Sequence, residues 1–148
     1  MIIEVILVFI ASYLSGSIPF GLIFSKVFLN QDIRNIGSKN IGATNVLRTG
    51  NKIIAGLTLI FDISKGIIPV LITKEHFVDL IYLSSLAAFL GHIFPFWLKF
   101  KGGKGVATYL GIIFILSLEL GIIFCISWVL ISVITKYSSL SSILSSLI

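Results

Sequence analysis

The chain has 148 residues, of which 57 % are hydrophobic and only 11 % are charged, and its mean hydropathy is +1.12. A soluble domain typically carries about 25 % charged residues, so this composition excludes a soluble globular protein and predicts an integral membrane protein. The formal net charge of +5 comes from cations in short loops between apolar runs. That pattern orients a membrane protein and does not indicate nucleic-acid binding. The single cysteine, Cys125, excludes an internal disulfide and a multi-cysteine metal site.

The first apolar segment, residues 2–23, is predicted to cross the membrane, because its length matches a hydrocarbon core of roughly 30 Å. No basic region precedes it and no small-residue cleavage site is evident, so we interpret it as a retained span and not a signal peptide. Pro19 lacks a backbone donor and predicts a kink. Ser12 and Gly16 form a small-xxx-small pair that allows a neighbouring helix to approach closely. A packing role is favoured here over a substrate role.

The segment between residues 26 and 52 is polar, glycine-punctuated and basic. No apolar face repeats at helical or strand spacing through residues 32–48, so we expect no core element there. By the positive-inside rule the segment is cytoplasmic and the N-terminus is outside. The acidic residue Asp32 stands alone against five cations: Lys26, Arg34, Lys39, Arg48 and Lys52.

A second span is predicted over residues 53–72 and a third over residues 80–97. The second contains Asp62 and Lys65, which are three residues apart, share a helical face and could pair. Charges at such depth are costly, so a structural ion pair and a substrate-lining role both remain open. After the third span, the KFKGGKG stretch at residues 99–105 carries three lysines and no acid, which predicts a return to the cytoplasm.

The apolar stretch 106–135 is too long for one simple span, since it would extend about 45 Å as a single helix. We therefore predict a hairpin that turns near residues 118–121 and places Lys136 inside. The serine-rich tail, residues 138–146, is assigned no chemistry, although it could begin a further span. The predicted fold is an all-α polytopic integral membrane helical bundle with about five transmembrane helices, its N-terminus outside, forming a single domain over residues 1–148.

Two basic, glycine-containing loops are thus predicted to face the same compartment. Arginine suits bidentate recognition of phosphate, and glycines allow backbone amides and a following helix N-terminus to approach an anion. The predicted site binds an anionic substrate at the membrane surface. Its candidate residues are Ser38, Lys39, Asn40, Thr44, Asn45, Arg48, His92, Gly102, Gly103, Lys104 and Gly105.

Several other kinds of site are excluded. KGGKG is not a Walker A loop, because Leu98 stands where its first glycine belongs and Gly105 replaces its Ser/Thr. There is no G-x-S-x-G elbow, and the two histidines lack metal-ligand spacing. Neither His76 nor His92 is followed five residues later by Asp, so the dyad of acyl-CoA-dependent glycerophosphate acyltransferases is absent. His92 lies in an apolar segment, where a hydrogen-bonded structural histidine is favoured over a catalytic base. No metal and no cofactor are predicted.

Five motifs in order carry a resemblance to a known family. Together they closely resemble the bacterial membrane acyl-phosphate:glycerol-3-phosphate acyltransferases over nearly the whole chain. The motifs are GSIPFGLI (16–23), DIRNIGSKNIGATNVLR (32–48), FDISKG (61–66), GHIFPFWLKFKGGKGVAT (91–108) and KYSSLSSI (136–143).

The resemblance implies an all-helical, multi-pass enzyme of the bacterial inner membrane, active at the cytoplasmic face, with membrane lipid around it. Such an enzyme transfers a fatty acyl group from acyl phosphate to the 1-hydroxyl of glycerol 3-phosphate, in the first acylation of phospholipid biosynthesis. Ser38 and Arg48 match the family's essential serine and arginine, and residues 102–105 match its glycine-rich phosphate loop. We hypothesise that Arg48, Lys104 and the loop amides hold phosphate. Ser38 would orient a substrate without having to be a covalent nucleophile.

Two departures from the family pattern follow from the sequence. Lys39 stands where the family usually has glycine, and its charge could either tune or crowd phosphate binding. The family also continues through further spans to a third cytoplasmic motif, which this sequence lacks at its end, Ile148. The alternatives to an active, shortened acyltransferase are an inactive relative that still binds phosphate and a non-catalytic protein that binds or transports a phosphorylated solute.

Overall fold

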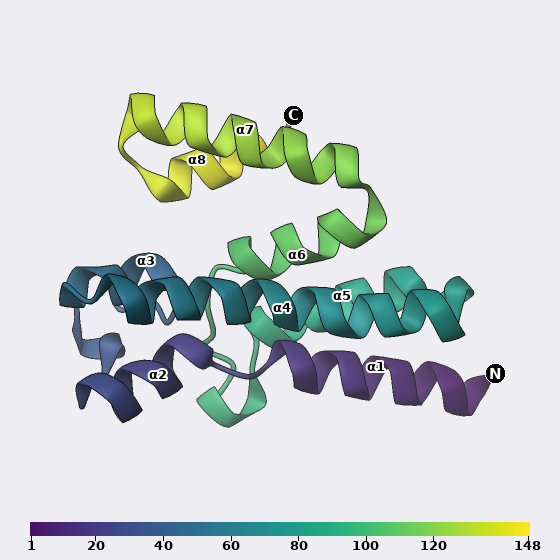
Figure 1. Cartoon of the computed structure of the whole chain (residues 1–148). Helices are drawn as coiled ribbons and strands as arrows, with labels where there is room; N and C mark the ends of the chain where they lie inside the picture. The colour runs from purple at the N-terminus through teal and green to yellow at the C-terminus, as the bar shows by residue number, and fades with distance from the viewer.

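The computed structural model describes residues 1–148 as a bundle of helices without strands (Figure 1). Four helical stretches are long and apolar enough to cross a membrane, namely Ile2–Leu29, Lys52–His76, Val78–Leu98 and Leu118–Thr135, and a shorter apolar helix covers Val106–Leu116. The predicted all-α membrane architecture is therefore confirmed, while the outside position of the N-terminus stays a prediction. The α-helices are α1 (Ile2–Gly16), α2 (Phe20–Leu29), α3 (Ala43–Val46), α4 (Lys52–His76), α5 (Ile81–Ile93), α6 (Val106–Leu116), α7 (Leu118–Thr135) and α8 (Ser138–Ser145).

The first predicted span is broken into α1 and α2 at Pro19, which is a larger disruption than the expected kink. The helical hydrogen-bond pattern is interrupted at the break, and a carbonyl left unpaired in an apolar surrounding costs free energy. Side chains from two other elements bond carbonyls at the break. Trp97 donates its indole N–H to the carbonyl of Ser17 at 2.7 Å, and the ammonium of Lys65 donates to the carbonyl of Ile18 at 2.7 Å.

Helices α1 and α5 pack closely, as the small-residue pair predicted. The hydroxyls of Ser12 and Ser84 lie 2.8 Å apart. A Cβ on Gly16 would lie only 2.0 Å from the carbonyl oxygen of Ala88. Any larger residue at position 16 would therefore push the two helix backbones apart.

The first loop contributes to the core, contrary to the sequence prediction. Ile33, Ile41 and Val46 are almost completely buried and pack in one cluster with Leu22 of α2 and Ile54 of α4. Short 3₁₀ turns at Ile33–Asn35 and Leu47–Thr49, together with α3, bring these side chains to the same side. Their spacing along the chain is irregular, and periodicity could not reveal them.

The predicted hairpin between α6 and α7 is present, and its turn lies at Ser117, just before the expected residues. The hydroxyl of Ser117 accepts the backbone N–H of Leu120 at 3.3 Å and caps α7. That the serine-rich tail begins a further span stays a prediction. The tail forms α8, which folds back beside α7 (Figure 1), where the indole N–H of Trp128 donates to the hydroxyl of Ser142 at 3.0 Å.

Helix α6 runs alongside the second half of α4, in the same direction. A Cβ on Gly66 would lie 2.4 Å from the carbonyl oxygen of Thr108, and one on Gly111 would lie 2.3 Å from that of Ile63. The start of α6 therefore lies beside the middle of α4, close to Asp62. This arrangement sets the position of the second glycine-rich loop, which leads directly into α6.

Candidate active site

Asn45 organises the first loop. Its side chain is 1 % exposed, and its Oδ1 accepts the backbone N–H of Ser38 at 3.0 Å and the hydroxyl of Ser38 at 3.2 Å. Its Nδ2 donates to the carbonyls of Ile33 and Asn40, both at 2.8 Å. These two bonds use both N–H donors of the Asn45 side-chain amide. Asn45, which was predicted to bind substrate, thus holds Ser38 in place and folds the loop around itself.

Arg48 lies across the backbone of Gly37. Gly37 has φ +52, and a Cβ there would lie 2.7 Å from Nη1 of Arg48 and 2.7 Å from Oδ1 of Asn45. A glycine at this position accepts the left-handed backbone conformation and lets the guanidinium approach the Ser38 turn. Arg48 is exposed and forms no hydrogen bond or ion pair within the chain. Its donors are therefore available to an anion.

Arg34, by contrast, is neutralised inside the loop. Its guanidinium donates to both carboxylate oxygens of Asp32, with the shortest contact at 2.6 Å. This pairing lowers the pKa of the Asp32 carboxyl well below its ordinary value and raises the pKa of Arg34. Lys39 is exposed, with φ +58, a conformation that suits glycine better than lysine. Its side chain does not line the cavity described below.

The second loop, residues 102–105, is referred to as the glycine loop. The N–H groups of Gly102 and Gly103 donate to the carbonyls of Ile93 and His92, at 3.0 and 3.1 Å. This corrects the expectation that these two amides face an anion, because the last carbonyls of α5 need donors of their own. The amides of residues 104–108 donate to no backbone carbonyl, so the free donors are those of Lys104 and the first turn of α6.

Gly105 makes the turn into α6. Its φ is +81, and a Cβ there would lie 2.5 Å from the ring of Phe89. Both the backbone conformation and the space therefore require glycine. With the turn fixed, the positive end of the α6 dipole and its free N–H groups lie together next to Lys104, an arrangement suited to an anion.

Both loops open into one cavity of ≈ 600 Å³. Residues more than fifty positions apart in sequence meet there, with polar groups at the loops and apolar side chains of α4, α6 and α7 along the rest of the wall. The predicted site residues that line it are Ser38, Asn40, Thr44, Asn45, Arg48, His92, Lys104 and Gly105; Lys39, Gly102 and Gly103 do not. The apolar wall includes Leu59, Ile63, Leu110, Phe124 and Val129.

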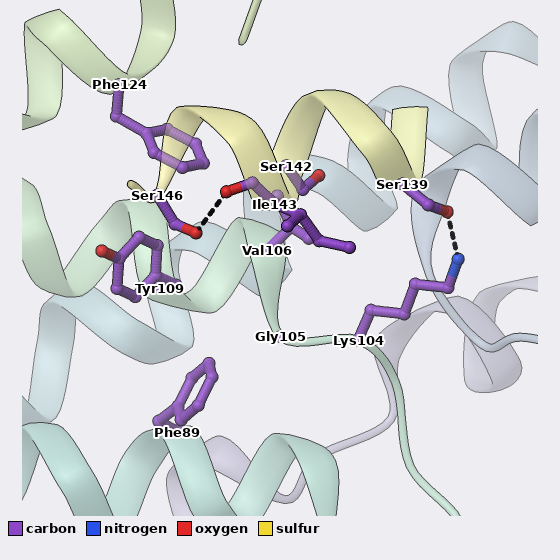
Figure 2. A pocket seen from close by; sticks show the side chains of 10 residues that line it. All are labelled: Phe89, Lys104, Gly105, Val106, Tyr109, Phe124, Ser139, Ser142, Ile143 and Ser146. Atoms are coloured by element: carbon purple, nitrogen blue, oxygen red, sulfur yellow. Dashed lines mark hydrogen bonds between the residues drawn. The ribbon is translucent and has the colours of Figure 1, made fainter. Parts of the chain in front are cut away.

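A second cavity of ≈ 410 Å³ lies beside the first and shares Lys104 with it. Figure 2 shows the ring of Phe89 on one side of this cavity and α8 on the other, with Lys104 donating a hydrogen bond to the hydroxyl of Ser139. Ser139 and Ser142 line both cavities. The sequence interpretation gave the serine-rich tail no chemistry, although the KYSSLSSI motif was a signal that its serines have a specific place.

The arrangement combines cations with an apolar chamber. Arg48, Lys104 and the free amides of α6 can bind phosphate through charge-assisted hydrogen bonds. The apolar wall can hold a hydrocarbon chain, since burying apolar surface is favourable. Ser38 presents a hydroxyl between these two environments, and no histidine or carboxylate is hydrogen-bonded to it. The site is therefore equipped to position and neutralise phosphorylated substrates.

Comparison with known proteins gives consistent results. The sequence profile of the glycerol-3-phosphate acyltransferase family matches residues 6–148. A glycerol-3-phosphate acyltransferase of Pelagibacter ubique is 59 % identical over 97 % of this chain and 75 % of its own length. One of Bartonella henselae is 53 % identical over 96 % of this chain and 70 % of its own length.

Solved structures agree with the sequence relatives. The crystal structure of PlsY (YgiH), an integral membrane glycerol 3-phosphate acyltransferase, in its glycerol 3-phosphate form, superposes with a TM-score of 0.91 at 39 % identity. The superposition covers 97 % of this chain and 73 % of the PlsY chain. The lysophosphatidic acid form of the same enzyme gives a TM-score of 0.88 at 38 % identity, over 72 % of its length and 97 % of this chain.

Proposed function

The chain belongs to the glycerol-3-phosphate acyltransferase family, and from this membership we propose that it transfers a fatty acyl group from acyl phosphate to the 1-hydroxyl of glycerol 3-phosphate. It is a multi-pass membrane acyltransferase of phospholipid biosynthesis. The observation that supports the proposed reaction best is the single cavity in which Ser38, Arg48 and Lys104 meet an apolar wall. Both substrates carry phosphate and one carries an acyl chain, so this combination fits the pair.

We assign phosphate binding to Arg48, to Lys104 and to the free amides at the start of α6. Arg48 has no partner within the chain, and Lys104 is held only by the hydroxyl of Ser139, which a phosphate oxygen can replace. Ser38 orients the reacting group from the edge of the cavity. Asn45 acts through Ser38, because its Oδ1 fixes both the backbone and the hydroxyl of that residue.

The reaction needs little covalent chemistry from the protein. The 1-hydroxyl oxygen of glycerol 3-phosphate attacks the acyl carbon, and the bond between that carbon and the bridging phosphate oxygen breaks. The products are 1-acyl-glycerol 3-phosphate and inorganic phosphate, and the hydroxyl proton leaves with the phosphate. Acyl phosphate is already activated, so holding two anions side by side and stabilising the developing charge can supply much of the rate enhancement.

The apolar wall between α4, α6 and α7 receives the acyl chain. The cationic loops bear the positive charge expected on the cytoplasmic side of a bacterial inner membrane, and we place the site at that face. The alternative of a non-catalytic binding or transport protein is not favoured, because the relatives are acyltransferases.

The decisive experiment measures phosphate release from acyl phosphate by the purified protein, with and without glycerol 3-phosphate. We expect release that depends on glycerol 3-phosphate, with 1-acyl-glycerol 3-phosphate as product. Ser38→Ala and Arg48→Ala should abolish turnover while membrane insertion stays intact. An active Arg48→Ala enzyme would overturn the assignment of Arg48, and absence of turnover by well-folded wild-type protein would overturn the proposed reaction.

A further inference from the structure

His92 lies where the end of α5, the glycine loop and the start of α6 meet. Its ring is 4 % exposed, with Nδ1 3.0 Å from the hydroxyl oxygen of Thr108. Its backbone carbonyl accepts the N–H of Gly103. The other side of the ring faces the glycine loop, because a Cβ on Gly103 would lie 2.1 Å from Nε2. One imidazole therefore contacts both the loop and the first turn of the helix that follows it.

The protons in this contact can be assigned from the partners. The hydroxyl of Thr108 lies 3.0 Å from the backbone carbonyl oxygen of Asp62. A carbonyl can only accept, so this hydrogen bond uses the single hydroxyl proton of Thr108. The hydroxyl oxygen can then only accept from His92, and Nδ1 must carry a proton. In a neutral ring Nε2 is consequently the unprotonated nitrogen.

Asp62, whose backbone carbonyl is the last acceptor in this chain of hydrogen bonds, is itself held in place by its neighbours. Its carboxylate lies 2.8 Å from the ammonium of Lys65, and both side chains are buried. Lys65 also bonds the carbonyl of Ile18 at the break between α1 and α2. The backbone of α4 at Asp62 is thus tied to α1 and α2 on one side and to α6 on the other.

We infer that His92 and Thr108 are positioning residues that set the glycine loop and the first turn of α6 through a directed relay. The relay runs from His92 Nδ1–H to the Thr108 hydroxyl and from that hydroxyl to the Asp62 carbonyl. Since the free amides belong to residues 104–108, a small shift of α6 displaces all of them together with Lys104. The inference rests on the proposed function, in that this loop binds the phosphate of glycerol 3-phosphate.

Kinetics of two Thr108 variants test the relay. Thr108→Val keeps the shape but removes the hydroxyl, and we expect the KM for glycerol 3-phosphate to rise about tenfold with kcat little changed, the size of one lost hydrogen bond. Thr108→Ser keeps the hydroxyl and should restore the wild-type KM. The matched control is Thr73→Val, because Thr73 is also buried, in α4, but its hydroxyl bonds only the carbonyl of Pro69 within its own helix. An unchanged KM in Thr108→Val, or an equal rise in Thr73→Val, would overturn the inference.

The proton assignment has its own test, which does not require activity. The chain has two histidines, so a His76→Gln variant labelled with ¹⁵N-histidine reports His92 alone. We expect the imidazole nitrogen shifts of a ring protonated at Nδ1. A neutral ring protonated at Nε2 instead would overturn the relay even if Thr108→Val failed to fold. Absence of wild-type turnover would contradict the proposed reaction and leave this measurement decisive for the relay.

Discussion

Removing only the lysine of the buried Asp62–Lys65 pair should destabilise the bundle more than removing both charges. The two side chains are 4 % and 3 % exposed, and their charged atoms lie 2.8 Å apart. Lys65→Met leaves the Asp62 carboxylate buried without its counter-charge. Breaking one side of such a pair typically costs about 3–5 kcal/mol of unfolding free energy.

The double variant Asp62→Asn/Lys65→Met has a smaller expected cost. It removes both charges, and the carbonyl of Ile18 loses the ammonium at 2.7 Å but keeps the backbone N–H of Phe20 at 3.1 Å. Loss of one hydrogen bond to a charged donor costs roughly 1.5–3 kcal/mol. The double variant should therefore recover about 2 kcal/mol relative to Lys65→Met.

The assay is reversible unfolding in mixed detergent micelles, followed by far-ultraviolet circular dichroism. Lys74→Met is the control, because Lys74 also donates to a carbonyl, that of Ile115 at 3.1 Å, but from an exposed position. Its unfolding free energy should change by no more than about 0.5 kcal/mol. A double variant that is no more stable than Lys65→Met would refute the reasoning, since the cost would then not come from an uncompensated charge.

Three further predictions concern the loops and the cavity. Gly103→Ala should raise the KM for glycerol 3-phosphate at least about tenfold, because the new Cβ would lie 2.1 Å from His92 Nε2; steady-state kinetics checks this. Hydrogen bonding to Arg34 lowers the pKa of Asp32 in the folded protein. The contribution of Asp32 to the free energy of unfolding is therefore complete above the unfolded pKa of about 3.9 and is lost as the pH falls from there toward the lowered folded pKa. Arg34→Ala should abolish that acid-sensitive contribution, which we expect to be below about 1 kcal/mol in unfolding measured between pH 3 and 6. Cys125 lines the cavity, and Cys125→Phe should shift the ratio of kcat/KM values toward shorter acyl chains by about tenfold, comparable to the discrimination of a hydrophobic pocket.

The membrane fold could be predicted from sequence because its determinants are local. Apolar length predicts a span wherever it occurs, and the excess length of residues 106–135 was enough to predict the hairpin at α6 and α7. The break at Pro19 was underestimated, because its size depends on donors from Lys65 and Trp97, which are distant in sequence. The burial of Ile33 and Val46 depends on turns without periodicity and could not be derived from pattern.

The candidate site was predictable in its residue types and less so in their roles. The motifs placed Ser38 and Arg48 in the same loop, and the structure brings them into one cavity with Lys104. Sequence alone could not distinguish a ligand from a support, because Asn45 and Ser38 are both polar loop residues. The distinction depends on which partners already use their hydrogen-bonding groups. Thr108 was missed for the same reason, since a threonine in an apolar helix is unremarkable until its neighbours are known.

The position of α6 against the middle of α4 has a consequence for how the two substrates reach each other. α4 begins at Lys52, ten residues before Asp62, which corresponds to about 15 Å of helix. The glycine loop, which leads into α6, therefore lies beside the interior of α4 and not beside its first turn. The side chains of Ile53 and Ile60, in this part of α4, are apolar and exposed. Under the proposed reaction, we expect the hydrocarbon tail of the acyl donor to stay in the bilayer while its phosphate reaches this loop. The small polar acceptor would then be the substrate that enters from water, and no long-chain lipid would have to desorb from the bilayer.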